Sequence, residues 1–262
     1  EGLEYARDHA MLRVDHKLHL RCEITHPDIV SIFEHHSTSP LTAMMSVMDH
    51  APGDRQSPDV ETYRKRYQKN PNLAPDEVEA HIRELIEASK TYGPPNRKAL
   101  AALARERGIP LATHDDARAE HVEEAVAMGA VLTEFPTTLE AAEAARAHAL
   151  PTLMGSPNLI RGGSHSGNVA AAELARAELL DMFASDYIPA SLLQGALRLT
   201  ADDFGVPIPR AVAMVADAPA RALGLDDRGR LEVGRRADLV EVQLVRERPI
   251  VRSVWSAGRR VA

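Results

Sequence analysis

From about residue 96 onward, short apolar runs alternate with stretches of helical periodicity, and this alternation limits the fold more than any other feature of the chain. The apolar runs lie at 109–114, 130–135, 151–155 and 180–186, with helical patterns between them. The runs are apolar on both faces, which is typical of parallel strands covered by helices. The alternation therefore predicts an α/β protein with a parallel sheet inside and helices outside.

Two further strands are expected nearer the start, one running from residue 10 toward residue 24 and one at 41–48. These make about six of the eight strands of a closed (β/α)8 barrel, so the predicted barrel lacks its first strands. Residues 52–95 are polar and interrupted by prolines, which favours a long excursion on the catalytic side of the barrel. A helix with one apolar face is expected in the second half of this excursion.

The pattern changes near residue 226 to an alternation of period two with turn residues between the runs. This pattern predicts a few antiparallel strands outside the barrel. We therefore expect an incomplete barrel domain over 1–224 and a separate group of antiparallel strands over 225–262.

Composition excludes several classes of protein. Hydrophobic residues make up 44% and charged residues 26% of the 262 residues, which is typical of a folded globular chain. The formal net charge is −7 and the basic residues are scattered, so no nucleic-acid or membrane-surface partner is expected. No apolar run approaches the roughly 18 residues that span a bilayer. The single cysteine, Cys22, suits a reducing cytoplasm, and we expect a cytoplasmic protein whose partner is a small molecule. Assembly into a homo-oligomer stays open.

Polar side chains gather where the predicted strands end. Those of interest are His19, Glu23, His50, His114, Glu134 and Asp186. In a parallel barrel every carboxyl end of a strand opens onto the same face, so residues far apart in sequence converge there. Imidazoles and carboxylates together are the ligand set of a hydrolytic Zn, Mn or Fe site. A lone histidine such as His19 is more often a hydrogen-bonded structural residue, and Glu134 could equally cap a helix.

The segment 155–168 follows a predicted strand and precedes a predicted helix. It contains Arg161, Gly162, Gly163, Ser164, His165 and Asn168. Glycines allow backbone N–H groups to surround an anion, and an arginine adds a bidentate donor, so the segment predicts a phosphate site. A flexible glycine loop is the alternative, and no Walker motif is present. Arg55, after the strand at 41–48, is a second candidate phosphate contact, and His19 a candidate substrate contact.

Several motifs taken together resemble a known family. They are Asp15–Glu23, Met48–Gly53, His114–Asp116, Glu134–Thr138, Arg161–Asn168 and Ser185–Pro189. They are similar to the phosphonate-metabolism members of the amidohydrolase superfamily, the triphosphate diphosphatases of the carbon–phosphorus lyase pathway. The resemblance covers essentially the whole chain, and 161–168 is its most specific part. It implies a metal-dependent barrel that hydrolyses the 5-triphosphate of a ribose phosphonate and releases pyrophosphate. It also implies that the strands over 225–262 are part of a small β-sandwich.

The resemblance also implies roles for single residues. Glu23, His50 and His114 match metal-binding positions, and Asp186 matches an aspartate of the last strand that binds metal and accepts the proton of the attacking water. The superfamily's first barrel strand normally brings one or two histidine ligands, and no strand that could supply them precedes residue 10. We therefore expect the chain to be truncated at its N-terminus.

Two other functions remain open from the sequence. The same metal face serves deacetylases and deaminases that cleave a C–N bond, and the phosphate-type segment is the feature that argues against them. A metal-free, non-catalytic barrel that acts as an assembly subunit is the second alternative. Metal analysis would separate it from both enzymes.

Overall fold

The computed structural model describes residues 1–68, 74–164, 167–246 and 248–262. The chain divides into two compact units. The first unit comprises His19–Thr152 and Ser164–Val169, and the second comprises Glu1–Leu18, Leu153–Gly163 and Ala170–Ala262. Among the described residues, no helix combines the length and the apolar character needed to cross a bilayer.

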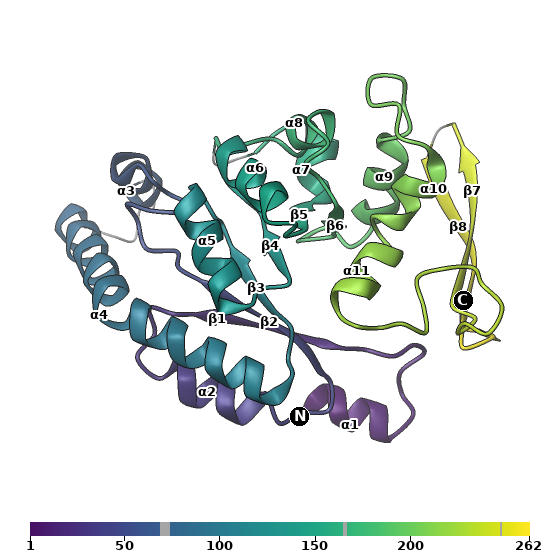
Figure 1. Cartoon of the computed structure of the whole chain (residues 1–262), viewed down its shortest axis with the longest axis horizontal. Coiled ribbons are helices and arrows are strands. Elements are labelled where there is room, and N and C mark those ends of the chain that lie inside the picture. The colour runs from purple at the N-terminus through teal and green to yellow at the C-terminus, as the bar shows by residue number, and fades with distance from the viewer. Residues whose placement is uncertain (69–73, 165–166, 247) are drawn as a thin grey trace. The chain divides into compact units, whose positions relative to one another are not determined.

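The first unit is built on four consecutive strands in the order β1-β2-β3-β4 (Figure 1). Their bounds are Leu18–Glu23, Thr42–Met48, Leu111–His114 and Leu132–Glu134. The pairs β2–β3 and β3–β4 are parallel, and in the second of them His114 lies opposite Glu134. The helices of this unit are α2 (Ile29–His36), α3 (Val60–Gln68), α4 (Pro75–Arg107), α5 (Ala119–Met128) and α6 (Leu139–Ala147).

Alternation along β1 separates a core face from a polar face. Cys22 and the following Ile24 are buried in an apolar cluster with Phe33 of α2, Met45 of β2 and Leu100 of α4. Figure 1 shows α2 and α4 side by side along these strands. Because successive side chains of a strand point to opposite faces, the residues between the core positions face away from this cluster. These are the polar residues of β1 that form part of the site described below.

Asn96 is of a residue type that often caps helices, but no helix begins there. Helix α4 continues through Pro94 and Pro95, and Asn96 lies buried inside it. The side-chain amide of Asn96 donates to the carbonyl oxygens of Ile24 at 2.9 Å and His26 at 3.0 Å. Asn96 therefore satisfies backbone acceptors that follow β1, instead of capping its own helix. The predicted apolar face earlier in α4 is confirmed, since Val78 and Ile82 are buried there with Tyr63, and Leu85 and Ile86 pack against them.

The second unit contains β5 (Thr152–Gly155) and β6 (Met182–Ala184), which pair in parallel. Its helices are α1 (Gly2–Asp8), α7 (Ser156–Arg161), α8 (Ala171–Arg176), α9 (Ser191–Arg198), α10 (Ile208–Ala213) and α11 (Asp217–Ala222). Helix α9 packs closely on α7 at Gly195, where an added Cβ would lie 2.0 Å from Ser156 Oγ. A three-stranded antiparallel sheet completes the unit with β7 (Leu239–Val245), β8 (Arg248–Ser256) and β9 (Arg259–Arg260).

The predicted α/β class is confirmed, including the small antiparallel sheet near the C-terminus. The expectation of a strand from residue 10 is wrong, because β1 begins only at Leu18 and the residues before it have no regular structure after α1. The division at residue 224 stays a prediction, and the two compact units divide the chain elsewhere.

Candidate metal centre

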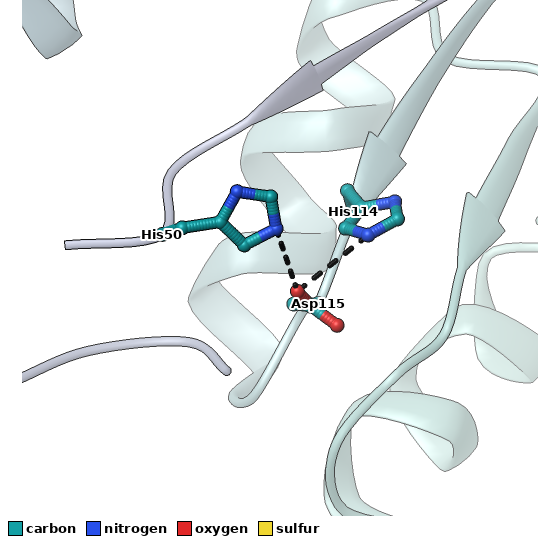
Figure 2. A group of neighbouring side chains, drawn as sticks. All are labelled: His50, His114 and Asp115. Carbon is teal, nitrogen blue, oxygen red and sulfur yellow. Dashed lines mark ion pairs between the residues drawn. The ribbon is translucent and has the colours of Figure 1, made fainter. Parts of the chain in front are cut away.

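Three side chains at the carboxyl ends of β2 and β3 offer ligand atoms to one point. His50 follows β2, His114 is the last residue of β3, and Asp115 comes directly after it. In Figure 2 both imidazoles point toward the carboxylate of Asp115. The Oδ2 atom of Asp115 lies 3.5 Å from Nε2 of His50 and 3.6 Å from Nε2 of His114. One ligand atom from each residue lies within 4.8 Å of the other two, and we call this group the triad.

Each imidazole also forms a hydrogen bond to a carboxylate of its own through its outer nitrogen, Nδ1. Nδ1 of His50 lies 2.6 Å from Oε2 of Glu23, and Nδ1 of His114 lies 3.0 Å from Oε2 of Glu134. An ionised carboxylate only accepts hydrogen bonds, so each Nδ1 carries a proton and donates it. This arrangement fixes the orientation of the ring and leaves Nε2 to bind a metal, as in many metalloproteins. The donor set of two imidazole nitrogens and one carboxylate oxygen thus fits a divalent ion such as Zn, Mn or Fe.

The charge balance at His50 supports this fit. Hydrogen bonds that His50 donates to Asp115 and to Glu23 raise the pKa of His50 to about 9, against the opposing effect of burial. Both carboxylates favour positive charge at the imidazole. The centre therefore stabilises a cation at this position, whether a proton or a metal ion.

Backbone conformation directs Asp115 toward the two histidines. Asp115 has φ +56° and Phe135, which follows β4, has φ +54°, values that residues other than glycine seldom adopt. The amide of Asp115 donates to the carbonyl oxygen of Glu134 at 2.9 Å, which holds this turn beside the end of β4. The ring of Phe135 meets that of His114 edge to face, with centroids 5.1 Å apart. Strained conformations of this kind cost about 1–3 kcal/mol each and concentrate at functional sites.

The neighbouring carboxylate, Asp116, stabilises the turn after β3 through buried hydrogen bonds. It is fully buried and accepts hydrogen bonds from Arg55 at 2.6 Å, from Thr133 at 2.7 Å and from Thr113. Arg55 is itself 5% exposed, and its other contacts are the carbonyl oxygen of His114 and the carboxylate of Glu124. These contacts link Arg55 to the end of β3, and its predicted contact with phosphate stays a prediction.

His19 and Arg21 lie on the polar face of β1, next to the triad. Nε2 of His19 is 2.9 Å from Ser46 Oγ and 3.8 Å from Oε1 of Glu134. Burial lowers the pKa of His19, and the charge of Arg21 adds to that effect while Glu134 opposes it. Arg21 places Nη2 3.3 Å from Nε2 of His114, and its Nε donates to Met48 Sδ at 3.1 Å.

A short hydrogen-bonded path leads from Asp115 to Asn168. Gln56 Nε2 donates to Oδ2 of Asp115 at 3.1 Å, and Nδ2 of Asn168 donates to the carbonyl oxygen of Gln56 at 3.5 Å. Asn168, one of the predicted phosphate contacts, is therefore linked to Asp115 of the triad by two hydrogen bonds through Gln56. Ser164 is half-buried in the same unit, and His165 lies outside the described residues.

The remaining predicted residues belong to the second unit. Arg161 ends α7, is exposed, and donates to Tyr187 Oη at 3.1 Å and to the carbonyl oxygen of Gly163 at 3.0 Å. Gly162 ends the helix with φ +88°, and Gly163 follows with φ +158°. Asp186 comes two residues after β6, is exposed, and has φ +50°.

The structure brings His50 and His114 together at the ends of β2 and β3 and places Glu23 beside His50. Glu23 contacts the outer nitrogen of His50 and is not part of the triad, so its role as a ligand stays a prediction. Asp115 was missed as a candidate ligand. The His114–Asp115–Asp116 run did single out the region, but two adjacent carboxylates give no signal as to which one turns toward the histidines.

Sequence comparison with known proteins identifies the family to which this chain belongs. Residues 72–262 match the model of the Amidohydrolase family. The chain is 44% identical over 261 residues to alpha-D-ribose 1-methylphosphonate 5-triphosphate diphosphatase of Escherichia coli strain K12, covering 99% of this chain and 69% of that protein.

Solved structures give weaker matches. A Bifidobacterium longum protein described as a prolidase is 16% identical, with 93% of this chain and 79% of that chain covered at a TM-score of 0.47. A zinc-bound adenosine deaminase from Xanthomonas campestris is 19% identical, with 89% and 63% covered at a TM-score of 0.45. Both scores are below 0.5, so the assignment depends on the sequence matches. By these, the chain belongs to the amidohydrolase family, whose members are hydrolytic enzymes that generally depend on a divalent metal ion.

Proposed function

We propose that this chain hydrolyses alpha-D-ribose 1-methylphosphonate 5-triphosphate to the 5-phosphate and releases pyrophosphate. The proposal depends above all on the triad, in which two imidazoles backed by carboxylates meet a third carboxylate at the ends of parallel strands. The 44% identity to the diphosphatase of Escherichia coli indicates which hydrolysis this centre performs. Water is the second substrate, and the bond that breaks is a P–O bond of the triphosphate.

The metal in this proposal is zinc, with manganese and iron as the alternatives. Nε2 of His50, Nε2 of His114 and a carboxylate oxygen of Asp115 would hold it. Such an ion would lower the pKa of a water molecule and polarise a phosphoryl oxygen. Glu23 and Glu134 keep both imidazoles in the tautomer that leaves Nε2 available. We also assign Asp186 to the metal, as the match to the last-strand aspartate implies.

The chain supplies the proton acceptor and the contacts that position the substrate. Asp186 accepts the proton of the attacking water at its carboxylate, and its exposed position after β6 is consistent with this role. Arg161, the glycines after it and Asn168 stay our candidates for holding phosphate oxygens, a positioning role rather than a chemical one. The proposed place of action is the cytoplasm, with a phosphorylated sugar phosphonate as the small-molecule partner.

The test compares substrates on the metal-loaded chain. Pyrophosphate release from the ribose phosphonate triphosphate is measured beside ammonia or acid release from a panel of N-acyl and cyclic amide substrates. We expect turnover of the triphosphate alone. Turnover of an amide, with none of the triphosphate, would assign the centre to C–N hydrolysis instead.

Replacing Asp186 with asparagine tests the proton acceptor. We expect Asp186→Asn to lower turnover at least about a hundredfold while the far-UV circular dichroism spectrum stays unchanged, because the amide has nearly the same size but cannot accept the proton. Turnover within a few fold of the unmodified chain would remove Asp186 from this role.

A further inference from the structure

Arg21, a cation beside the triad, has no carboxylate partner among the residues that the structure describes. Arg21 lies in β1 two residues before its end and is exposed, and its side chain contacts the nitrogen of His114 and the sulfur of Met48, both uncharged acceptors. A thioether sulfur accepts hydrogen bonds only weakly, and an imidazole nitrogen offers a single lone pair. Within the described part of the chain, no ion pair of Arg21 with Asp or Glu is found.

Other arginines of the first unit are held differently. Arg55 pairs with Asp116 and Glu124, and Arg97 pairs with Glu124 at 2.7 Å. A guanidinium has five N–H donors in a planar fork that matches two oxygens of a carboxylate or phosphate. Among the described residues, the Arg21 guanidinium has acceptors only in His114 and Met48, while Glu23 and Glu134 pair with His50 and His114.

From this arrangement we infer that Arg21 binds an anionic phosphoryl or phosphonate oxygen of the substrate next to the metal centre. The lone pair on Nε2 of His114 can serve the guanidinium or a metal ion, but not both. If His114 binds a metal, the Arg21 guanidinium keeps only the weak hydrogen bond to Met48, and its other N–H groups can donate to the bound anion. The inference rests on the proposed function for the identity of the substrate, but it requires only that the ligand carries a tetrahedral oxyanion.

Position favours this role over a purely structural one. Arg21 comes from β1, the triad from the ends of β2 and β3, and all belong to the first unit. The guanidinium reaches to 3.3 Å from a triad nitrogen, so an anion that contacts the metal lies within reach of its donors. A fixed positive charge there neutralises charge that develops on phosphoryl oxygens during hydrolysis.

The experiment uses anion binding and metal binding as separate measurements. Inorganic phosphate and methylphosphonate are titrated calorimetrically into the zinc-loaded chain and into its Arg21→Gln and Arg21→Lys variants. Affinity for Co²⁺ is measured in parallel from its visible absorption. We expect Arg21→Gln to weaken binding of both anions by at least about tenfold, the loss typical of a charged hydrogen bond, with Co²⁺ affinity within about twofold of the unmodified chain. Arg21→Lys should recover part of the affinity.

Arg107→Gln is the matched control, because it removes an arginine that contacts Glu34 and Ser37 of the α2 region instead. It should leave phosphate binding unchanged. The inference is overturned if the unmodified chain binds neither anion, if Arg21→Gln binds them within twofold of it, or if Arg21→Gln loses Co²⁺ affinity in proportion. Failure of the proposed function is distinguishable, since it appears as absent pyrophosphate release by a chain whose Arg21-dependent anion binding is intact.

Discussion

The strand ends of the first unit and the segment 155–163 of the second unit both carry charged and polar residues, but they hold them in different ways. At the strand ends each imidazole forms a hydrogen bond to its own carboxylate. The neighbouring Asp116 is fully buried and accepts hydrogen bonds from three side chains. In the other segment Arg161 is exposed and donates to a phenol and a backbone carbonyl. Preorganisation therefore comes from buried carboxylates that fix their neighbours, and a concentration of polar residues in a loop does not produce it alone.

The two regions share one property, which is backbone strain where strands end. Asp115 and Phe135 in the first unit and Asp186 in the second have positive φ although none is glycine. Such conformations persist only where the surrounding structure compensates for them. In the first unit the compensation is visible in the hydrogen bond from Asp115 to the backbone of Glu134 and in the packing of Phe135 on His114.

We expect the largest difference between the two regions in how much an arginine of each contributes to the free energy of unfolding. Arg55→Ala leaves the buried Asp116 without its charged partner, so we expect the free energy of unfolding to fall by about 3–5 kcal/mol. Arg161→Ala removes an exposed side chain with neutral partners and should change the same quantity by less than about 0.5 kcal/mol. Urea unfolding followed by circular dichroism measures both. Similar losses in the two variants would contradict the distinction between the regions.

A second difference concerns ligand binding by the segment itself. If Arg161 makes its charged hydrogen bonds to the substrate, Arg161→Ala weakens binding of the phosphate-bearing substrate by about 1.5–3 kcal/mol. The matched measurement uses a neutral ester, whose turnover should change much less. An equal loss on both substrates would point to a structural role for the segment.

Much of this arrangement is accessible from sequence because it follows from periodicity. The apolar runs predicted β2 to β6, and the parallel arrangement explained why His50 and His114 meet. Side-chain roles that depend on a local turn were not accessible. Asp115 and Asp116 are neighbours of identical type, and only the positive φ at Asp115 sends one to the histidines and the other into the core.

Contacts between residues that are distant in the sequence could not be predicted either, because they depend on the folded geometry. Asn96 has the side chain of a typical helix cap, and Arg55 that of a phosphate ligand, yet buried acceptors from other elements engage both. The motif at Asp15–Glu23 contains Arg21 but does not single it out, because its proposed role follows from the absence of a carboxylate partner among the described residues. A sequence indicates which groups are available, whereas burial and geometry decide which of them are already satisfied.

The smallest expected effect distinguishes a metal ligand from a residue that positions one. Glu23 contacts Nδ1 of His50, and glutamine can still accept that hydrogen bond through its amide oxygen but lacks the charge. If Glu23 acts through His50, Glu23→Gln should lower Co²⁺ affinity by about tenfold, at the lower end of what outer partners of metal ligands contribute. Asp115→Asn, which alters a member of the triad, should lower it further. Absorption titrations of the two variants and the unmodified chain make the comparison, and a greater loss in Glu23→Gln than in Asp115→Asn would make Glu23 the ligand and Asp115 the supporting residue.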